Sequence, residues 1–350
     1  MDMVDLTNLE ELKKLDPRDT ITSTEMLPEQ LAAAWEEVKS IEVPQEYSKV
    51  TSIVFCGMGA SIYGALVVKS LFGADFPYPL EMVSDYHLPK YVGPNTLVVL
   101  TSYSGTTEEV LSCAQEAKQM DAKMLVLTKG GPLAEFAKTN NIPAYVFDGK
   151  LNPAGVPRLG NGYTIIGLMG LLHKAGIITL DEEKLKGGIE HIKKNKARII
   201  ERAMHDAHSV MGHIPVIFMA EHLSGNAQIL RNQFNETSKT FSAFYLIPDL
   251  NHHLMEGLQF PQPSNLKFML FGSYSYSPKI QKRVELTMKV VQDNKQAIME
   301  YIPLGTDKYQ DFLEVLSLGS YTTLYLGLLY EQNPAINPWV DYFKNELAKE

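Results

Sequence analysis

The stretch Thr101-Ser102-Tyr103-Ser104-Gly105-Thr106-Thr107-Glu108-Glu109 decides the fold class of this chain. The apolar run Thr96–Leu100 precedes it and is typical of a buried strand, and a helical pattern over Thr106–Met120 follows it. A buried strand, a short polar loop and a helix form the repeating unit of a parallel sheet that is covered by helices. The stretch therefore predicts an α/β fold, with this loop at the carboxyl end of a central strand.

The same strand–loop–helix unit recurs along most of the sequence. Ser52–Cys56 is an apolar run followed by a glycine turn and a helical pattern, and the alternation restarts at Ile214 after a charged segment. We predict two doubly wound domains, each a mostly parallel sheet flanked by helices, over residues 1–178 and 213–350, with a helical connector over 179–212. The other expected strands and the last two helices are Lys123–Leu127, Ala144–Phe147, Pro215–Met219, Ala243–Ile247, Leu266–Phe271, Ala297–Ile302, the amphipathic helix Tyr309–Tyr330 and the helix Trp339–Ala348.

The length, net charge and cysteine content of the chain limit its possible domain number, its partners and its disulfides. At roughly 150 residues per domain, a chain of 350 residues has room for two domains. The net charge of −9 disfavours wholesale binding to nucleic acid or to an anionic membrane, so an anionic ligand needs a local site. Cys56 and Cys113 are too few for a disulfide framework, and we expect both to be buried, reduced thiols.

No segment predicts secretion or membrane insertion. Met1–Asp5 has neither the basic nor the apolar region of a signal peptide. The apolar stretch Tyr163–Leu172 is too short to span a bilayer. The sequence therefore predicts a cytoplasmic protein without nucleic-acid or membrane partners.

The loop after Thr96–Leu100 has the chemistry of a phosphate site. Hydroxyl groups at the carboxyl end of a strand lie beside the free N–H groups and the positive dipole end of the next helix. Gly105 permits the tight turn, and Ser102, Ser104 and Thr107 supply donors. The alternative is that Thr106 only caps the helix, in a capping box with Glu109. Because four hydroxyls in six residues exceed the need of one cap, we favour ligand binding.

A second glycine turn, Gly57-Met58-Gly59-Ala60-Ser61, follows the strand Ser52–Cys56. It is not a dinucleotide fingerprint, because the third glycine falls at Gly64 and breaks the G-x-G-x-x-G spacing. It also lacks the lysine of a nucleotide-binding P-loop. We expect Gly59 and Ser61 to contribute to the same phosphate site.

These two loops, together with later motifs, resemble the sugar isomerase (SIS) fold and, within it, the bifunctional phosphoglucose/phosphomannose isomerases. The sequence departs from the family pattern at Ala60, usually glycine, at Thr106, usually asparagine, and at Asn333–Asn337, which lacks the threonine-proline pair. The matching segments are Leu27-Pro28-Glu29-Gln30 with Trp35, Gly57–Ser61, Ser102–Glu109, Pro157-Arg158, Asn235-Glu236-Thr237-Ser238-Lys239, Asn251-His252 and Asp341-Tyr342-Phe343-Lys344.

The resemblance implies an isomerase that interconverts glucose 6-phosphate and fructose 6-phosphate through a cis-enediolate. It implies Glu236 as the base, Arg158 as the cation that stabilises the enediolate, and His252 and Lys344 as ring-opening groups. In the family the histidine comes from the neighbouring subunit, which implies a homodimer. The route needs no metal and no organic cofactor. The departure before Lys344 leaves open whether mannose 6-phosphate is also used.

Other functions fit the sequence less well. The nine histidines lack H-E-x-x-H or a comparable ligand spacing, and Ser102 and Ser104 lack the G-x-S-x-G pattern of a covalent nucleophile. Two alternatives remain. An amino-sugar phosphate isomerase is one, although Asp2 stands where such synthases usually carry a glutaminase cysteine. A non-catalytic sugar-phosphate-binding regulator is the other, although such proteins usually have one SIS domain and a DNA-binding helix-turn-helix.

Overall fold

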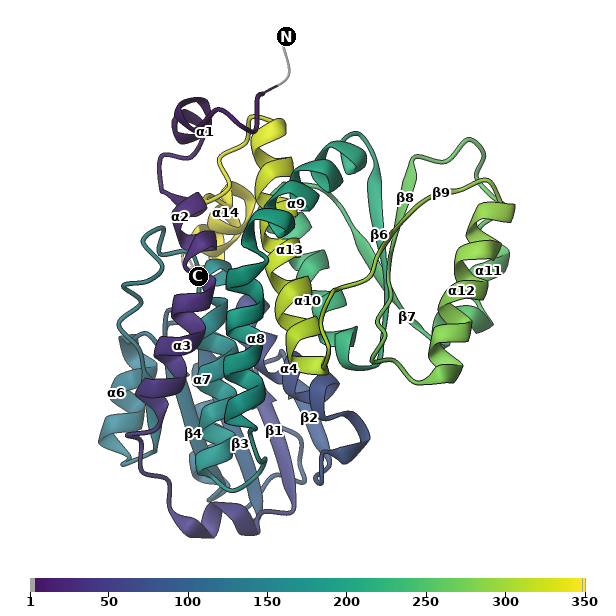
Figure 1. Ribbon diagram of the computed structural model, residues 1–350. Helices are drawn as coiled ribbons and strands as arrows, with labels where there is room; N and C mark the ends of the chain where they lie inside the picture. Colours follow the sequence, from purple (N-terminus) through teal and green to yellow (C-terminus); the bar gives the residue numbers. More distant parts are fainter. Residues whose placement is uncertain (1–3, 348, 350) are drawn as a thin grey trace.

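The computed structural model describes residues 4–347 and 349, and so leaves Met1–Met3, Ala348 and Glu350 outside the description. These residues form two parallel sheets, each flanked by helices (Figure 1). The prediction of two doubly wound domains is confirmed. The first sheet has the order β2-β1-β3-β4-β5, with β1 Ser52–Cys56, β2 Leu80–Val83, β3 Thr96–Ser102, β4 Lys123–Thr128 and β5 Ala144–Val146. The second has the order β7-β6-β8-β9, with β6 Ile214–Ala220, β7 Ala243–Ile247, β8 Leu266–Phe271 and β9 Ala297–Tyr301.

Strand β3 lies at the centre of the first sheet and is buried along its whole length. Leu97 and Val99 face one apolar layer with helices α4 (Tyr63–Phe72) and α7 (Asn161–Lys174). Val98 and Leu100 face a second layer, which also holds the buried thiols Cys56 and Cys113, beneath α5 (Glu108–Gln119) and α6 (Gly131–Thr139). Because successive residues of a strand point to opposite faces, a continuous apolar run is what a sheet covered on both sides requires.

Two elements of the first domain, the strand β2 and the helix α5, differ from the prediction. Strand β2 was not predicted, because Leu80–Val83 is a short edge strand that is half exposed and follows Pro77 and Pro79. Helix α5 begins at Glu108 rather than at Thr106, which leaves the whole hydroxyl-rich loop outside the helix. The N-terminal segment carries α1 (Leu9–Leu15), α2 (Thr20–Glu25) and α3 (Leu27–Val38).

Helix α13 (Lys308–Leu329) lies at the centre of the molecule, between the two domains (Figure 1). It was expected to be amphipathic, and this expectation is wrong. Of Tyr309–Leu329 only Gln310 is not buried, because α8 (Glu182–Lys194), α9 (Lys196–Val210) and α10 (Ser224–Glu236) pack around it. The helix is long and apolar enough to cross a bilayer, but the apolar window is 100% buried inside the protein. It is therefore a core helix.

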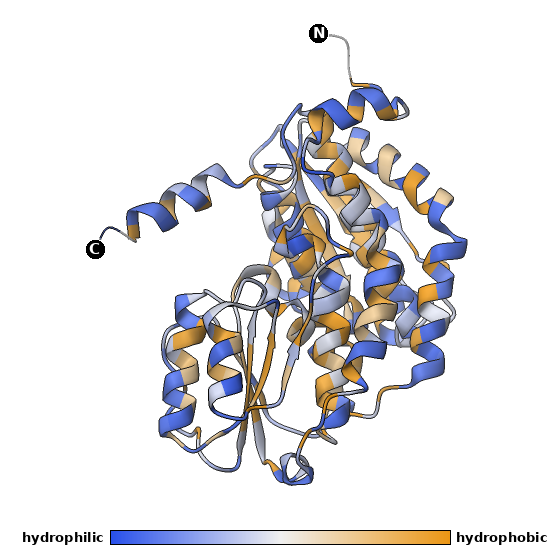
Figure 2. Ribbon diagram, turned by 90° about the vertical axis from the view of Figure 1, so that its left-hand side faces the viewer, coloured by the Kyte–Doolittle hydropathy of each residue, from blue (hydrophilic) through white to orange (hydrophobic). Residues whose placement is uncertain are grey.

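The segment 179–212 forms α8 and α9, whose apolar faces pack on α13 while their charged faces are exposed. The second domain is completed by α11 (Leu254–Gly257) and α12 (Pro278–Asp293). The last helix, α14 (Pro338–Leu347), has no buried residue. It projects from the body of the molecule, next to the C-terminus in Figure 2, and it presents apolar side chains such as Trp339 and Phe343 to solvent.

Candidate active site

The candidate site lies where the carboxyl ends of β1 and β3 meet the second domain. The chain runs from β1 to β2 on one side and returns to β3 on the other, so the strand order reverses between β1 and β3. Ligands of open α/β sheets bind at such a point. The turn η2 (Gly59–Ile62), which follows β1, contacts the turn η4 (Pro157–Leu159) and also contacts α10. Both predicted phosphate loops, Arg158 and the helix that carries Glu236 are therefore neighbours.

The loop after β3 presents its hydroxyls as a preformed cluster. Ser102 Oγ lies 2.7 Å from Thr107 Oγ1 and accepts the N–H of Gly105 at 3.0 Å. Ser104 Oγ lies 2.8 Å from Thr106 Oγ1. Thr107, not Thr106, is the N-cap residue of α5, and its side chain makes no capping hydrogen bond, so the alternative of a capping box between Thr106 and Glu109 does not describe this helix. The first-turn N–H groups of α5 are left for a ligand.

The two glycine-containing loops are tied together by a hydrogen bond. The N–H of Tyr103 donates to Ser61 Oγ at 2.9 Å, which leaves the Ser61 hydroxyl proton free to donate. Gly105 has a φ of +74°, and a Cβ there would lie 1.8 Å from the carbonyl oxygen of Gly130. Only glycine fits this position. The loop is therefore held in one conformation before any ligand arrives.

Arg158 is buried, with only 2% of its surface exposed, although a lone arginine in a loop would be expected at the surface. Its Nε donates to Thr237 Oγ1 at 3.0 Å, one terminal nitrogen donates to the carbonyl oxygen of Pro334, and the other lies 3.4 Å from Glu236 Oε2. Burial lowers the pKa of Arg158, while the charge of Glu236 opposes this shift. A guanidinium stays protonated under these conditions, so the site contains a fixed cation.

The turn that carries Arg158 is held by Gln30 of α3. The Gln30 amide donates to the carbonyl oxygens of Leu159 and Leu151, both at 2.9 Å, and its oxygen accepts the N–H of Gly162 at 3.2 Å. The sequence offered one signal for this role, because Gln30 is a polar residue on the apolar face of α3. Its partners could not be predicted from the sequence.

Glu236 is the last residue of α10, and donors surround its carboxylate and its backbone. Asn337 Nδ2 donates to Oε2 at 3.2 Å, the same oxygen that faces Arg158. Lys239 has a φ of +55°, and its ammonium turns back to the carbonyl oxygen of Glu236 at 2.6 Å. Burial, and then the charge of Arg158, lower the pKa of Lys239 to about 8. Burial and the charge of Glu236 raise the pKa of the Tyr63 phenol.

Two predicted site residues are not brought to this cluster by a single chain. His252 is exposed at the end of the turn η6 (Asp249–His252), and its ring makes no hydrogen bond or ion pair with the described residues. Lys344 is exposed on the projecting helix α14 (Figure 2) and has no partner within residues 4–347. Their roles stay predictions, whereas Glu236 and Arg158 are in direct contact.

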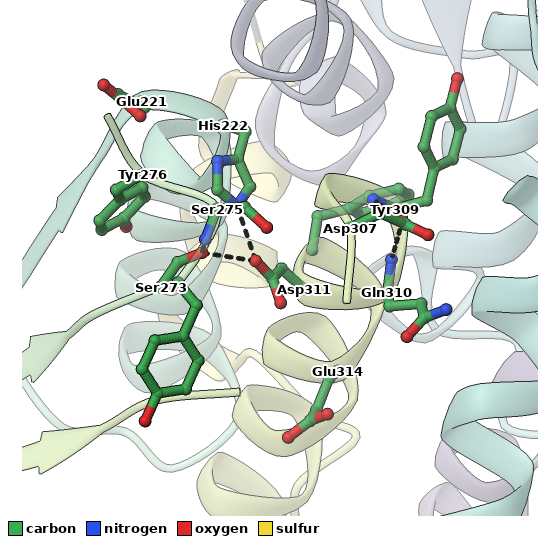
Figure 3. Close-up of polar contacts among 12 residues, drawn as sticks. Glu221, His222, Ser273, Ser275, Tyr276, Asp307, Tyr309, Gln310, Asp311 and Glu314 are labelled. Atoms are coloured by element: carbon green, nitrogen blue, oxygen red, sulfur yellow. Dashed lines mark hydrogen bonds and ion pairs between the residues drawn. The ribbon is translucent and has the colours of Figure 1, made fainter. Parts of the chain in front are cut away.

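The corresponding edge of the second sheet is filled by the chain's own carboxylates (Figure 3). The loop after β8, Ser273–Ser277, lies before α12 as the Ser102 loop lies before α5. There Glu221 accepts the N–H of Ser277 at 3.0 Å, in the place that an anion would take at the start of α12. Asp311 accepts the Ser273 hydroxyl at 2.6 Å and lies 3.1 Å from His222 Nε2. Of the two corresponding loops, the loop before α12 is therefore occupied by Glu221, and we take the loop before α5 in the first domain as the candidate phosphate site.

Comparison with known proteins agrees with the fold. A family model described as "SIS domain" matches residues 46–144, and one described as "Bacterial phospho-glucose isomerase C-terminal SIS domain" matches residues 199–347. A hypothetical protein of Thermus thermophilus has a similar structure, with a TM-score of 0.75 at 18% sequence identity over 97% of this chain and 93% of that chain. The chain is thus a two-domain protein of the SIS class.

Two curated relatives are similar to this chain over nearly its whole length. The bifunctional phosphoglucose/phosphomannose isomerase of Caldicellulosiruptor bescii is 27% identical over 92% of this chain and 97% of its own length. The enzyme of the same name from Aquifex aeolicus is 29% identical over 90% of this chain and 94% of its own length. Over nearly its whole length, the chain is therefore similar to the bifunctional phosphoglucose/phosphomannose isomerases.

Proposed function

We propose that this chain is an aldose–ketose isomerase that interconverts glucose 6-phosphate and fructose 6-phosphate, accepts mannose 6-phosphate as the second aldose, and works in the cytoplasm. The observation that carries the proposal is the contact between Glu236 and Arg158 beside a preformed phosphate loop. A regulator that only binds sugar phosphates has no need for a carboxylate held against a buried cation. The curated relatives described above carry both activities in their names.

The proposed reaction moves one proton between neighbouring carbons. The phosphate group binds to Ser61, Ser102, Ser104, Thr107, the Gly59 backbone and the start of α5. Glu236 takes the proton from carbon 2 of the open-chain aldose, and the electrons of that C–H bond form the double bond of a cis-enediolate. The former carbonyl oxygen gains negative charge, which Arg158 stabilises. Glu236 then returns the proton to carbon 1, while the hydroxyl proton of carbon 2 passes to the oxygen of carbon 1, and the ketose results.

Ring opening needs groups that the proton-transfer cluster does not contain. We assign this step to His252 and Lys344, with His252 supplied by the partner subunit of a homodimer. Its exposure in the single chain leaves it free for such a contact. An imidazole can both accept and donate a proton near neutral pH.

The experiment that tests this function is an assay of the purified protein with fructose 6-phosphate, in which glucose 6-phosphate and mannose 6-phosphate are followed separately. We expect both aldoses from the wild type and neither from Glu236→Gln. Glu135→Gln, an exposed carboxylate on α6, is the matched control and should keep full activity. A wild type that forms neither aldose would refute the proposed function.

A further inference from the structure

The carboxamide of Asn337 contacts the proposed base directly. Its Nδ2 donates to Glu236 Oε2 at 3.2 Å, and the nearest guanidinium nitrogen of Arg158 lies 3.4 Å from that same oxygen. Among the residues that the structure describes, none donates to Oε1. We propose that Asn337 is a positioning residue, which holds Oε2 and leaves Oε1 as the atom that accepts the substrate proton. This inference rests on the proposed function.

The backbone that precedes Asn337 is anchored against the first domain, and this places the Asn337 side chain beside Glu236. On one side, Pro334 is buried and accepts a hydrogen bond from Arg158, and Ala335 packs on Ala154, Val156 and Leu159. On the other side, the carbonyl oxygen of Asn337 accepts the N–H of Asp341 in the first turn of α14.

Two donors on one oxygen have consequences for a base. They fix the rotation of the carboxylate, so that the other oxygen points in one direction. The neutral amide of Asn337 does this without adding a third positive charge beside Arg158 and Lys239. Removing the amide should therefore lower the rate of proton transfer.

The side chain of Asn337 has no other hydrogen-bond partner within residues 4–347, so its contact with Glu236 can be removed selectively. A merely structural role would lower the melting temperature and leave the pH profile of the folded fraction unchanged. A positioning role lowers kcat more than it changes KM, and it moves the acidic limb of the pH profile.

The test compares Asn337→Ala and Asn337→Asp with the control Asn345→Asp, the same amide-to-carboxylate change at an exposed position of α14. For Asn337→Ala we expect kcat with fructose 6-phosphate to fall about ten- to hundredfold, with KM within about threefold of wild type. For Asn337→Asp, a carboxylate of like charge beside Glu236 should move the acidic limb of kcat/KM to higher pH by about one unit. The control should match the wild type in both.

The proposal is overturned if Asn337→Ala and Asn337→Asp keep kcat and the acidic limb of the wild type. Should Asn337→Ala fail to fold, the isosteric Asn337→Asp decides alone, through its pH profile. An inactive wild type would be a different result, because it would remove the proposed function and with it this role of Asn337.

Discussion

A terminal guanidinium nitrogen of Arg158 lies 3.4 Å from Glu236 Oε2, although the two residues are 78 positions apart and belong to different domains. The contact joins the turn η4 of the first domain to the end of α10 in the second. A fixed cation and the proposed base therefore lie in one cluster, beside the predicted phosphate-binding loops of the first domain.

Arg158→Lys should abolish most of the activity and also destabilise the protein. An ammonium on a flexible chain cannot bond Thr237, Pro334 and Glu236 at once, so buried acceptors lose their donor. We expect kcat/KM to fall at least about a hundredfold, from loss of charge stabilisation in the transition state. Steady-state kinetics and thermal unfolding measure the two effects. Arg202→Lys on α9, whose guanidinium pairs with Asp206 rather than with a predicted site residue, is the control for activity, and an equal loss of activity in both variants would contradict the assigned role.

Gln30→Leu tests whether the turn that carries Arg158 needs its amide clamp. The substitution keeps the size of the side chain but leaves the carbonyl oxygens of Leu151 and Leu159 and the N–H of Gly162 without this partner. We expect the free energy of unfolding to fall by about 2–4 kcal/mol, measured by urea denaturation. The exposed Gln115→Leu on α5 should change it by less than about 0.5 kcal/mol. Unchanged stability of Gln30→Leu would show that the clamp is dispensable.

Ser102→Ala should weaken binding of the phosphate group. The hydroxyl orders the loop through Thr107 and Gly105, and in the proposed complex it donates to the ligand. We expect KM for fructose 6-phosphate and the inhibition constant of inorganic phosphate to rise together by about tenfold. Ser112→Ala, a serine of α5 outside the loop, is the comparison. A rise in KM without a change in phosphate inhibition would place Ser102 elsewhere in the complex.

The stability of the protein should depend on pH through Lys239. Burial lowers the pKa of Lys239 to about 8 in the folded chain, against an ordinary value of 10.5. Between these values the unfolded chain holds more protons than the folded chain, so the free energy of unfolding rises with pH in this window. Lys239→Met lacks this contribution. The free energy of unfolding of the wild type should therefore exceed that of Lys239→Met by more at about pH 10 than at about pH 7, as measured by urea denaturation. A difference between the two proteins that is the same at both pH values would contradict the shift.

Subunit mixing tests whether His252 acts across a dimer interface. Glu236→Gln and His252→Asn are each expected to be inactive as homodimers. If His252 acts in the partner's site, a heterodimer of the two variants contains one intact site, and equimolar mixing should restore about a quarter of the wild-type activity. If the mixture stays inactive although heterodimers have formed, His252 does not act in trans.

The alternation of strands and helices was predictable because buried parallel strands are continuous apolar runs. The expected bounds of β1, β7 and β8 match those of the structure, whereas the edge strand β2 carried no such signal. The error at α13 has a physical reason. Its polar residues, such as Asp311 and Glu314, suggested a solvent face, but they are buried and bonded to Ser273 and Arg198.

The candidate site was predictable in part. Hydroxyls after a strand indicate a phosphate loop, and the family resemblance singled out Glu236 and Arg158. Their mutual contact depends on how two domains pack, which no local pattern encodes. For the same reason no sequence pattern indicated that Asn337 would donate to Glu236, or which backbone groups the buried Gln30 would bond.

The central claim is that Glu236 moves a proton between carbons 1 and 2 of the sugar. The most direct measurement is the conversion of fructose 6-phosphate in D2O, with the glucose 6-phosphate formed examined by proton NMR. We predict deuterium at carbon 2 of part of the product from the wild type, since a carboxylate base exchanges its proton with solvent, and no product from Glu236→Gln. Product without any solvent deuterium, or undiminished turnover by Glu236→Gln, would contradict the claim.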